Sequence, residues 1–242
     1  MTNSIHRARR VALPVVLLAL SGFPALAQTA SSPGEPLDGA GAAHQFDALT
    51  RRASDRIHAA LLIDERDEDA RLPLLVEAEQ LARAAIELSP ENPQGWFLAA
   101  AALGLRSQYV SMRQQMRMAR EIWSMSAAAL ERDSMHAGAH HVLGRLNLKA
   151  MGLSSVARIF ARHFFSAEVL QLATWEQAET HLVRAVELEP SLHHRLWLAR
   201  FYSDHGEDAR ARPILEAILA SPARTPLDRV WQREAAEDLE EL

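Results

Sequence analysis

The stretch that decides the fold runs from Thr174 to Gly206 and reads TWEQAETHLVRAVELEPSLHHRLWLARFYSDHG. Ala178, Leu182 and Ala185 recur at intervals of four and three residues, which predicts a helix with one small, apolar face. Pro190 ends this helix, because proline cannot continue the hydrogen-bond ladder. A second apolar stripe follows, made up of Leu196, Trp197, Leu198, Ala199 and Tyr202. The stretch therefore predicts two helices joined by a tight turn.

This pattern resembles the tetratricopeptide repeat, a helix-turn-helix unit of about 34 residues. The same pattern is readable upstream, at Ala78, Ala82, Ala85, Pro90, Trp96, Ala99, Ala100 and Leu103. Gly144 lies at a position where only a small residue lets paired helices touch. The resemblance implies an all-α protein, built as a right-handed α-solenoid of tetratricopeptide-like helix pairs.

The spacing between successive turns is longer than one repeat. Pro90 to Ser134 spans 44 residues and Ser134 to Pro190 spans 56, whereas a single repeat takes about 34. The second excess falls near residues 151–172 and is long enough for an inserted helix. The aromatic residues of that segment are Phe160, Phe164 and Phe165.

Residues 1–27 predict a secretory signal peptide. Three arginines precede an apolar run at 11–20, and Ala25-Leu26-Ala27 forms a small-x-small cleavage signal. The alternative, an uncleaved membrane anchor, fits less well because a bilayer span takes about 20 apolar residues. We expect a periplasmic or secreted protein with no membrane span after cleavage. Residues 28–42 predict a disordered linker rich in Ser, Pro and Gly, and residues 43–242 the helical repeat domain.

The charge balance argues against nucleic acid as a partner. The chain has 26 basic and 31 acidic residues and a net charge of −5, and loss of the three signal-peptide arginines lowers it to −8. Binding to phosphates requires a basic face. The chain also has no cysteine, and therefore neither a disulfide nor a thiolate metal ligand.

The block from His141 to Pro190 resembles the regulator of microtubule dynamics family, whose tetratricopeptide-like domain has an LGR helix followed by an inserted helix. The matching positions are Leu143, Gly144, Arg145, Leu153, Arg158, Ala161, Phe165, Glu176, Ala178, Ala185 and Pro190. The resemblance covers residues 72–219 and implies a helical interaction domain without catalysis. Because the signal peptide indicates an exported, bacterial-type relative, no role at tubulin is carried over.

Motifs that carry catalysis are missing from the sequence. It has no G-x-S-x-G elbow, phosphate-binding glycine loop or dinucleotide fingerprint, so we predict no enzyme activity and no cofactor. His136 and His140 are four residues apart, a spacing that can chelate zinc on one helix face, but no third ligand follows nearby. We interpret them, together with His141 and the pair His193-His194, as packed or solvated histidines, and predict no metal site.

Three polar residues beside the packing stripes, His141, Arg145 and Arg200, are predicted to lie on or near the concave face. The first helices of the pairs form this face, which in such solenoids binds a protein or peptide segment. The two arginines would clamp a carboxylate of the partner. The alternative is that they pair with glutamates on a neighbouring helix.

A second hypothesis is that the protein binds an apolar ligand. Phe160, Phe164 and Phe165 would then line a groove for a lipid or acyl chain. The alternative is that these aromatic side chains only fill the core of the helix stack.

The last helix is predicted to cap the stack. Its apolar stripe contains Trp231, which we expect to pack against the helix that holds Ile214 and Ile218. Its other face is acidic, as the outer face of a terminal repeat must be polar.

Overall fold

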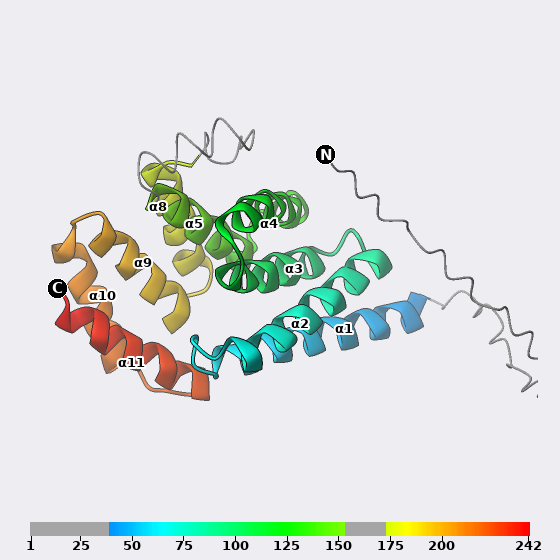
Figure 1. Cartoon of the computed structure of the whole chain (residues 1–242), viewed down its shortest axis with the longest axis horizontal. Helices are drawn as coiled ribbons and strands as arrows, with labels where there is room; N and C mark the ends of the chain where they lie inside the picture. Colours follow the sequence, from blue (N-terminus) through cyan, green and yellow to red (C-terminus); the bar gives the residue numbers. More distant parts are fainter. Residues whose placement is uncertain (1–38, 153–172) are drawn as a thin grey trace, which may run out of the picture. The chain divides into compact units, whose positions relative to one another are not determined.

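The computed structural model describes residues 39–152 and 173–242, and within these ranges every regular element is a helix (Figure 1). The elements are α1 (Gly39–Leu61), α2 (Glu68–Leu88), α3 (Pro93–Arg106), the 3-10 turn η1 (Ser107–Tyr109), α4 (Met112–Arg132), α5 (Ala137–Met151), α8 (Trp175–Leu188), α9 (Leu192–Asp204), α10 (Asp208–Ala220) and α11 (Pro226–Glu240). None of the described helices combines the length and apolar character that crossing a bilayer requires. The predicted inserted helix lies, apart from its first residues, outside the described residues.

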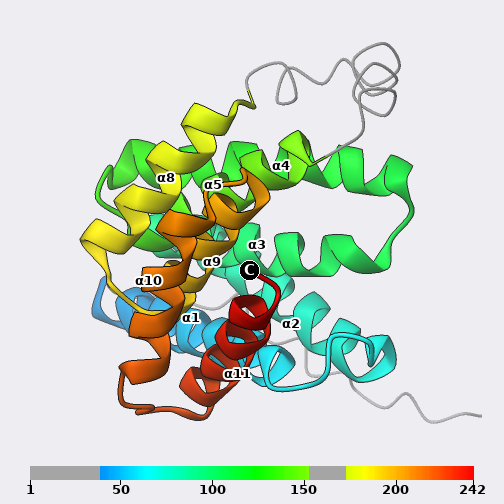
Figure 2. The ribbon, with the colours of Figure 1, turned by 90° about the vertical axis from the view of Figure 1, so that its left-hand side faces the viewer.

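The helices pack in two layers. Helices α1, α3, α5, α9 and α11 contact one another in that order, and α2, α4, α8 and α10 pack against successive members of that row. This is how first and second helices alternate in a stack of tetratricopeptide-like pairs, so the predicted all-α fold is confirmed. Figure 2 shows α11 lying close to α1 and α2, and Leu61, at the end of α1, packs into the apolar cluster of α9, α10 and α11.

Capping residues begin the helices. A side-chain oxygen accepts a hydrogen bond from a first-turn backbone N–H at Asn92, Thr174, Ser191 and Thr225. Pro93 and Pro226 occupy the first turns of α3 and α11, where a missing N–H costs nothing. Gly206, with a φ of 79°, turns the chain from α9 into α10. From Leu192 to Pro226, the starts of α9 and α11, the spacing is 34 residues, one repeat without an insertion.

Small residues set the separation of α5 and α8. A Cβ atom on Gly144 would lie 2.6 Å from Cγ of Leu182 and 3.1 Å from the backbone nitrogen of Leu182. No side chain fits in that space without moving the partner helix. The close approach predicted for Gly144 is therefore confirmed.

The two ends of the described domain differ in how well they were predicted. Helix α1 begins at Gly39, so the linker assignment is wrong for residues 39–42. Composition marked these residues by their glycines, but the alanines among them favour helix. The predicted burial of Trp231 against α10 is confirmed, because Trp231 is only 8 % exposed and packs in one cluster with Leu215 and Ile218.

Candidate partner-binding site

Helices α5 and α9 turn polar side chains toward each other. His141 and Arg145 on α5 are four residues apart, as are His193 and Trp197 on α9, so each pair lies on one helix face. The two faces meet, and acidic residues of α11 join them. We call this group the polar cluster; it consists of His141, Arg145, His193, His194, Trp197, Arg200, Glu234 and Asp238.

Trp197 is the platform of the polar cluster. The guanidinium carbon of Arg145 lies 3.8 Å from the centre of the Trp197 ring, and that of Arg200 lies 5.2 Å from it. Guanidinium groups are attracted to the face of an aromatic ring, most strongly to tryptophan. Trp197 therefore holds two arginine head groups from two different helices in fixed positions.

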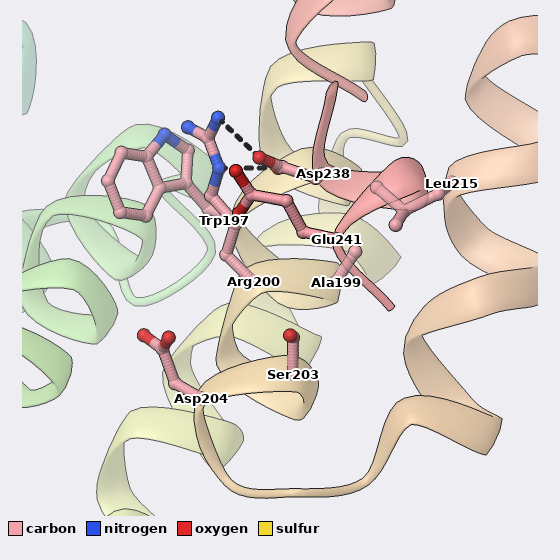
Figure 3. A pocket seen from close by; sticks show the side chains of 8 residues that line it. All are labelled: Trp197, Ala199, Arg200, Ser203, Asp204, Leu215, Asp238 and Glu241. Atoms are coloured by element: carbon pink, nitrogen blue, oxygen red, sulfur yellow. Dashed lines mark hydrogen bonds and ion pairs between the residues drawn. The ribbon is translucent and has the colours of Figure 1, made fainter. Parts of the chain in front are cut away.

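Arg200 is fully engaged with α11. Its Nε atom donates to Oδ2 of Asp238 at 2.6 Å, and its Nη2 atom donates to Oδ1 at 3.2 Å, a bidentate pair (Figure 3). Nη2 also lies 3.0 Å from Oε2 of Glu234. The alternative that the sequence left open, pairing with acids of a neighbouring helix, is thus what the structure shows for Arg200.

Arg145 differs from Arg200 because no carboxylate of the described residues lies within ion-pair distance of it. Burial and the neighbouring charge of Arg200 lower the pKa of Arg145 to about 10, against a smaller opposing effect of Glu234. The side chain is still charged at neutral pH. Arg145 is therefore a half-buried, oriented cation whose nearest charged neighbour has the same sign.

His141 lies beneath the arginines. It is only 4 % exposed, and neither ring nitrogen has a hydrogen-bond partner within the described part of the chain. Burial, followed by the nearby His193, His194 and Arg145, lowers its pKa well below the usual 6.5. A ring that is 4 % exposed offers a partner protein little surface, and the role of His141 in partner contact stays a prediction.

Two further imidazoles surround His141. The ring centres of His193 and His194 lie 4.4 Å and 4.8 Å from that of His141. His193 stacks on Trp231 at 4.5 Å with an interplanar angle of 21°, and burial together with Arg145 lowers its pKa well below 6.5. Nδ1 of His194 lies 2.8 Å from the carbonyl oxygen of Glu189. The packed interpretation of the His193-His194 pair therefore fits the structure, but its meeting with His141 was not predicted.

Comparison with known proteins places this architecture. The family model described as Regulator of microtubule dynamics protein 1-3 matches residues 40–242. The chain belongs to this family. Among solved structures, a thermophilic TPR protein from Thermus thermophilus has a similar fold, with a TM-score of 0.51 and 18 % identity over 81 % of this chain and 89 % of the other. The comparison with curated proteins finds no match.

A cavity of about 200 Å³ adjoins the polar cluster in this family member (Figure 3). It is lined by Trp197, Ala199, Arg200, Ser203, Asp204, Leu215, Asp238 and Glu241. Four of these side chains are ionisable, and an acyl chain would desolvate them without pairing them. Phe160, Phe164 and Phe165, which the apolar-ligand hypothesis requires, lie outside the described residues, so that hypothesis stays a prediction.

A second pair of histidines lies between α5 and α8. Nδ1 of His140 lies 2.9 Å from Nδ1 of His181 on α8, and Nε2 of His140 lies 3.0 Å from the carbonyl oxygen of Ser134. Burial lowers the pKa of His181 to about 4. His140 is thus half-buried and hydrogen-bonded, in agreement with the interpretation of a packed histidine.

The sequence predicted Arg145 and Arg200 as site residues, but it did not predict the aromatic and acidic residues that contact them. Trp197 was assigned only to a packing stripe, and Glu234 and Asp238 only to an acidic outer face. A usable signal was present, because the polar pair on α5 and the aromatic pair on α9 have the same four-residue spacing in successive first helices.

Proposed function

We propose that this family member is a non-enzymatic, exported scaffold that binds an acidic segment of a partner protein at the polar cluster. The observation that carries the proposal is the contrast between two arginines on one tryptophan. Arg200 has two carboxylate partners in α11, whereas Arg145 has none among the described residues. A carboxylate from a partner would form an ion pair with Arg145, as Asp238 does with Arg200.

The position of the polar cluster in the fold supports this proposal. Helices α5 and α9 both belong to the row of first helices. In solenoids of this kind the first helices line the concave surface that receives extended or helical segments. The flat Trp197 ring orients the guanidinium of Arg145 before a partner binds. A preorganised group loses less side-chain entropy on binding.

The chemistry favours binding over catalysis. The described cluster holds paired acids, cations and imidazoles, but no hydroxyl or thiol side chain of the described residues is hydrogen-bonded to one of its histidine rings. A nucleophile within hydrogen-bond reach of a base is the arrangement that covalent catalysis requires. This supports a scaffold role for the described part of the chain.

The test is binding of a defined peptide to the purified protein. A short Glu-rich peptide with a free C-terminal carboxylate is titrated by fluorescence anisotropy, alongside its Gln-substituted counterpart. We expect only the Glu peptide to bind, with an affinity that falls as salt is added. Arg145→Ala should weaken binding about tenfold, since hydrogen bonds to charged groups contribute ~1.5–3 kcal/mol.

The matched control is Arg212→Ala, which removes an exposed arginine of α10 from outside the polar cluster. It should bind the Glu peptide as the parent does. Equal weakening by Arg212→Ala, or equal binding of the Gln peptide, would contradict the proposed site. A lipid that co-purifies with the protein in a native mass spectrum would favour the apolar-ligand alternative.

Export is a separate part of the proposal and rests on residues 1–27. The protein recovered from the periplasm or medium of an expressing bacterium should begin near Gln28. A full-length chain retained in the cytoplasm, beginning at Met1, would overturn export and leave the peptide experiment unaffected.

A further inference from the structure

Three histidines that are distant in sequence converge in the polar cluster. His141 comes from α5, and His193 and His194 come from the first turn of α9. One ring nitrogen from each lies within 4.8 Å of those of the other two. We propose that this histidine trio binds a divalent transition-metal ion of the zinc type.

The ligand set selects the class of metal. Imidazole nitrogens suit Zn²⁺, Co²⁺, Ni²⁺ and Cu²⁺, whereas Mg²⁺ and Ca²⁺ require oxygen ligands. Three histidines with one remaining position form a known zinc arrangement. Imidazole nitrogens that bind one zinc ion lie nearer to one another than 4.8 Å. The three rings would therefore move closer to one another when the ion binds.

The unsatisfied nitrogens of His141 are an independent indication of a ligand. The side chain is 4 % exposed, and both Nδ1 and Nε2 lack a hydrogen-bond partner within the described residues. A buried polar atom without a partner is costly and rare in folded proteins. A metal bond to one of these nitrogens would use a lone pair that the described protein groups leave without a donor.

His194 is oriented as metal-binding histidines are. A carbonyl oxygen can only accept, so Nδ1 of His194, 2.8 Å from the carbonyl of Glu189, carries the hydrogen. In this tautomer, the nitrogen available to bind a metal is Nε2. A hydrogen bond from the second ring nitrogen fixes the tautomer and orientation of most histidine ligands. Stacking on Trp231 fixes the orientation of the His193 ring.

The surrounding charges determine what would complete the site. The positive charge of Arg200 is balanced by Asp238 and Glu234, while Arg145 has no such partner in the described chain. A dication next to Arg145 would therefore favour an anion, hydroxide or a carboxylate, in the fourth position. The proposal itself rests on the three histidines and holds whether or not the scaffold binds acidic peptides.

The test uses the whole purified protein, freed of metal by a chelator, with Zn²⁺ alone or Co²⁺ alone as the probe. Isothermal titration should show one tight site per chain. Co²⁺ should give the visible absorption of an ion with a low coordination number and nitrogen ligands. The melting temperature should rise with the Zn²⁺ concentration, since binding to the native state alone stabilises it. His193→Gln or His194→Gln should weaken Zn²⁺ binding by more than about 100-fold. Residues that only hydrogen-bond to metal ligands already contribute roughly 10–100-fold to metal affinity, and a ligand contributes more.

Two controls locate the site. His205→Gln, an exposed histidine outside the trio, and the double variant His140→Gln/His181→Gln should both keep the parent affinity. The helical circular dichroism signal shows whether each variant is folded. His141→Gln removes the most buried ring and can unfold the protein, so His193→Gln, at a half-buried position, is the decisive variant. The proposal is overturned if the parent binds no ion, if His193→Gln binds as the parent does, or if only the His140/His181 variant loses binding.

Discussion

Where α2, α3 and α4 meet, alanines pack with larger apolar side chains such as Leu103 and Met125, and Ala82, Ala99 and Ala100 are completely buried. Where α5, α9 and α11 meet, the contacts include histidines, arginines and two tryptophans, Trp197 and Trp231. Both junctions join helices of the same stack. The alanine-rich contact, called the alanine junction, shows that helices of this stack can pack through an apolar core with paired charges, so the polar cluster is not demanded by the fold.

Charged groups in the two regions differ in the same way. In the first, Glu79 is only 7 % exposed and pairs with Arg83 at 2.9 Å and Arg106 at 2.7 Å. In the second, Arg145 has no acidic partner among the described residues, and both nitrogens of His141 are unsatisfied. Unpaired buried polar groups lower stability. Buried atoms without a hydrogen-bond partner within the described residues also occur in α2 and α4, at Glu79 and Ser126. Binding is therefore assigned to the polar junction because Arg145 has no described acidic partner and three imidazoles meet there.

The largest expected effect is at the capping helix, which covers the polar junction. Trp231→Ala should lower the free energy of unfolding by ~3–5 kcal/mol, because the ring packs on Leu215, Ile218 and His193. Truncation after Ser221 should promote association as well, by exposing the apolar face of α10. Urea unfolding and size-exclusion chromatography measure both effects. A truncated protein that stays monomeric with an unchanged melting curve would contradict the capping role.

The alanine junction can be broken without touching the polar cluster. Leu103→Ala should lower the free energy of unfolding by ~2–5 kcal/mol, since Leu103 is 1 % exposed in the α1–α4 core. Affinity for the Glu-rich peptide, measured at a temperature where the variant is folded, should stay at the parent value. A large loss of affinity in this variant would show that the two regions are not separable.

A pair of glycines compares a tightly packed helix position, between α5 and α8, with an open one on α3. Gly144→Ala should cost ~1–3 kcal/mol, because its Cβ would clash with Leu182 at 2.6 Å. Gly104→Ala in α3 should be neutral or stabilise by up to about 1 kcal/mol, since nothing lies within 4 Å of its added Cβ. Both are measured by urea unfolding. Equal effects of the two changes would contradict the close approach of α5 and α8.

The buried histidines predict a pH dependence that originates in the polar junction. The folded-state pKa values of His141 and His193 are lowered below 6.5, mainly by burial. The unfolded chain therefore takes up protons first as the pH falls. Stability is fully present above about pH 6.5 and falls below it, by up to about 1.4 kcal/mol per pH unit for each ring.

This pH dependence is measured by urea unfolding at several pH values, with His193→Gln compared with the parent. Burial raises the pKa of Glu234, which acts in the opposite direction, so the difference between the two proteins is the informative quantity. The variant should lose less stability on acidification. Identical slopes would show that the His193 ring is not held neutral.

The sequence predicted the frame of the molecule better than its site. Turn prolines, caps and alanine spacing are local signals, so the helix pairs, Gly144 and the burial of Trp231 could be read directly. Arg145 and Arg200 could be selected as polar residues beside a packing stripe. That one is paired and the other is not depends on where α11 returns, and the meeting of His141 with His193-His194 depends on how α5 crosses α9. Both depend on tertiary packing, which the spacing of residues along one helix does not predict.

The central claim, that the polar junction binds and the alanine junction only supports, is tested most directly with two arginines. Arg145→Ala and Arg106→Ala are each assayed for affinity to the Glu-rich peptide and for urea unfolding. We predict that Arg145→Ala weakens the affinity about tenfold and lowers stability less than Arg106→Ala does, because Arg145 loses its stacking on Trp197 but no described ion pair. Arg106→Ala should lower stability, because buried Glu79 loses its 2.7 Å partner, and leave the affinity unchanged. Equal affinities of the two variants would contradict the claim.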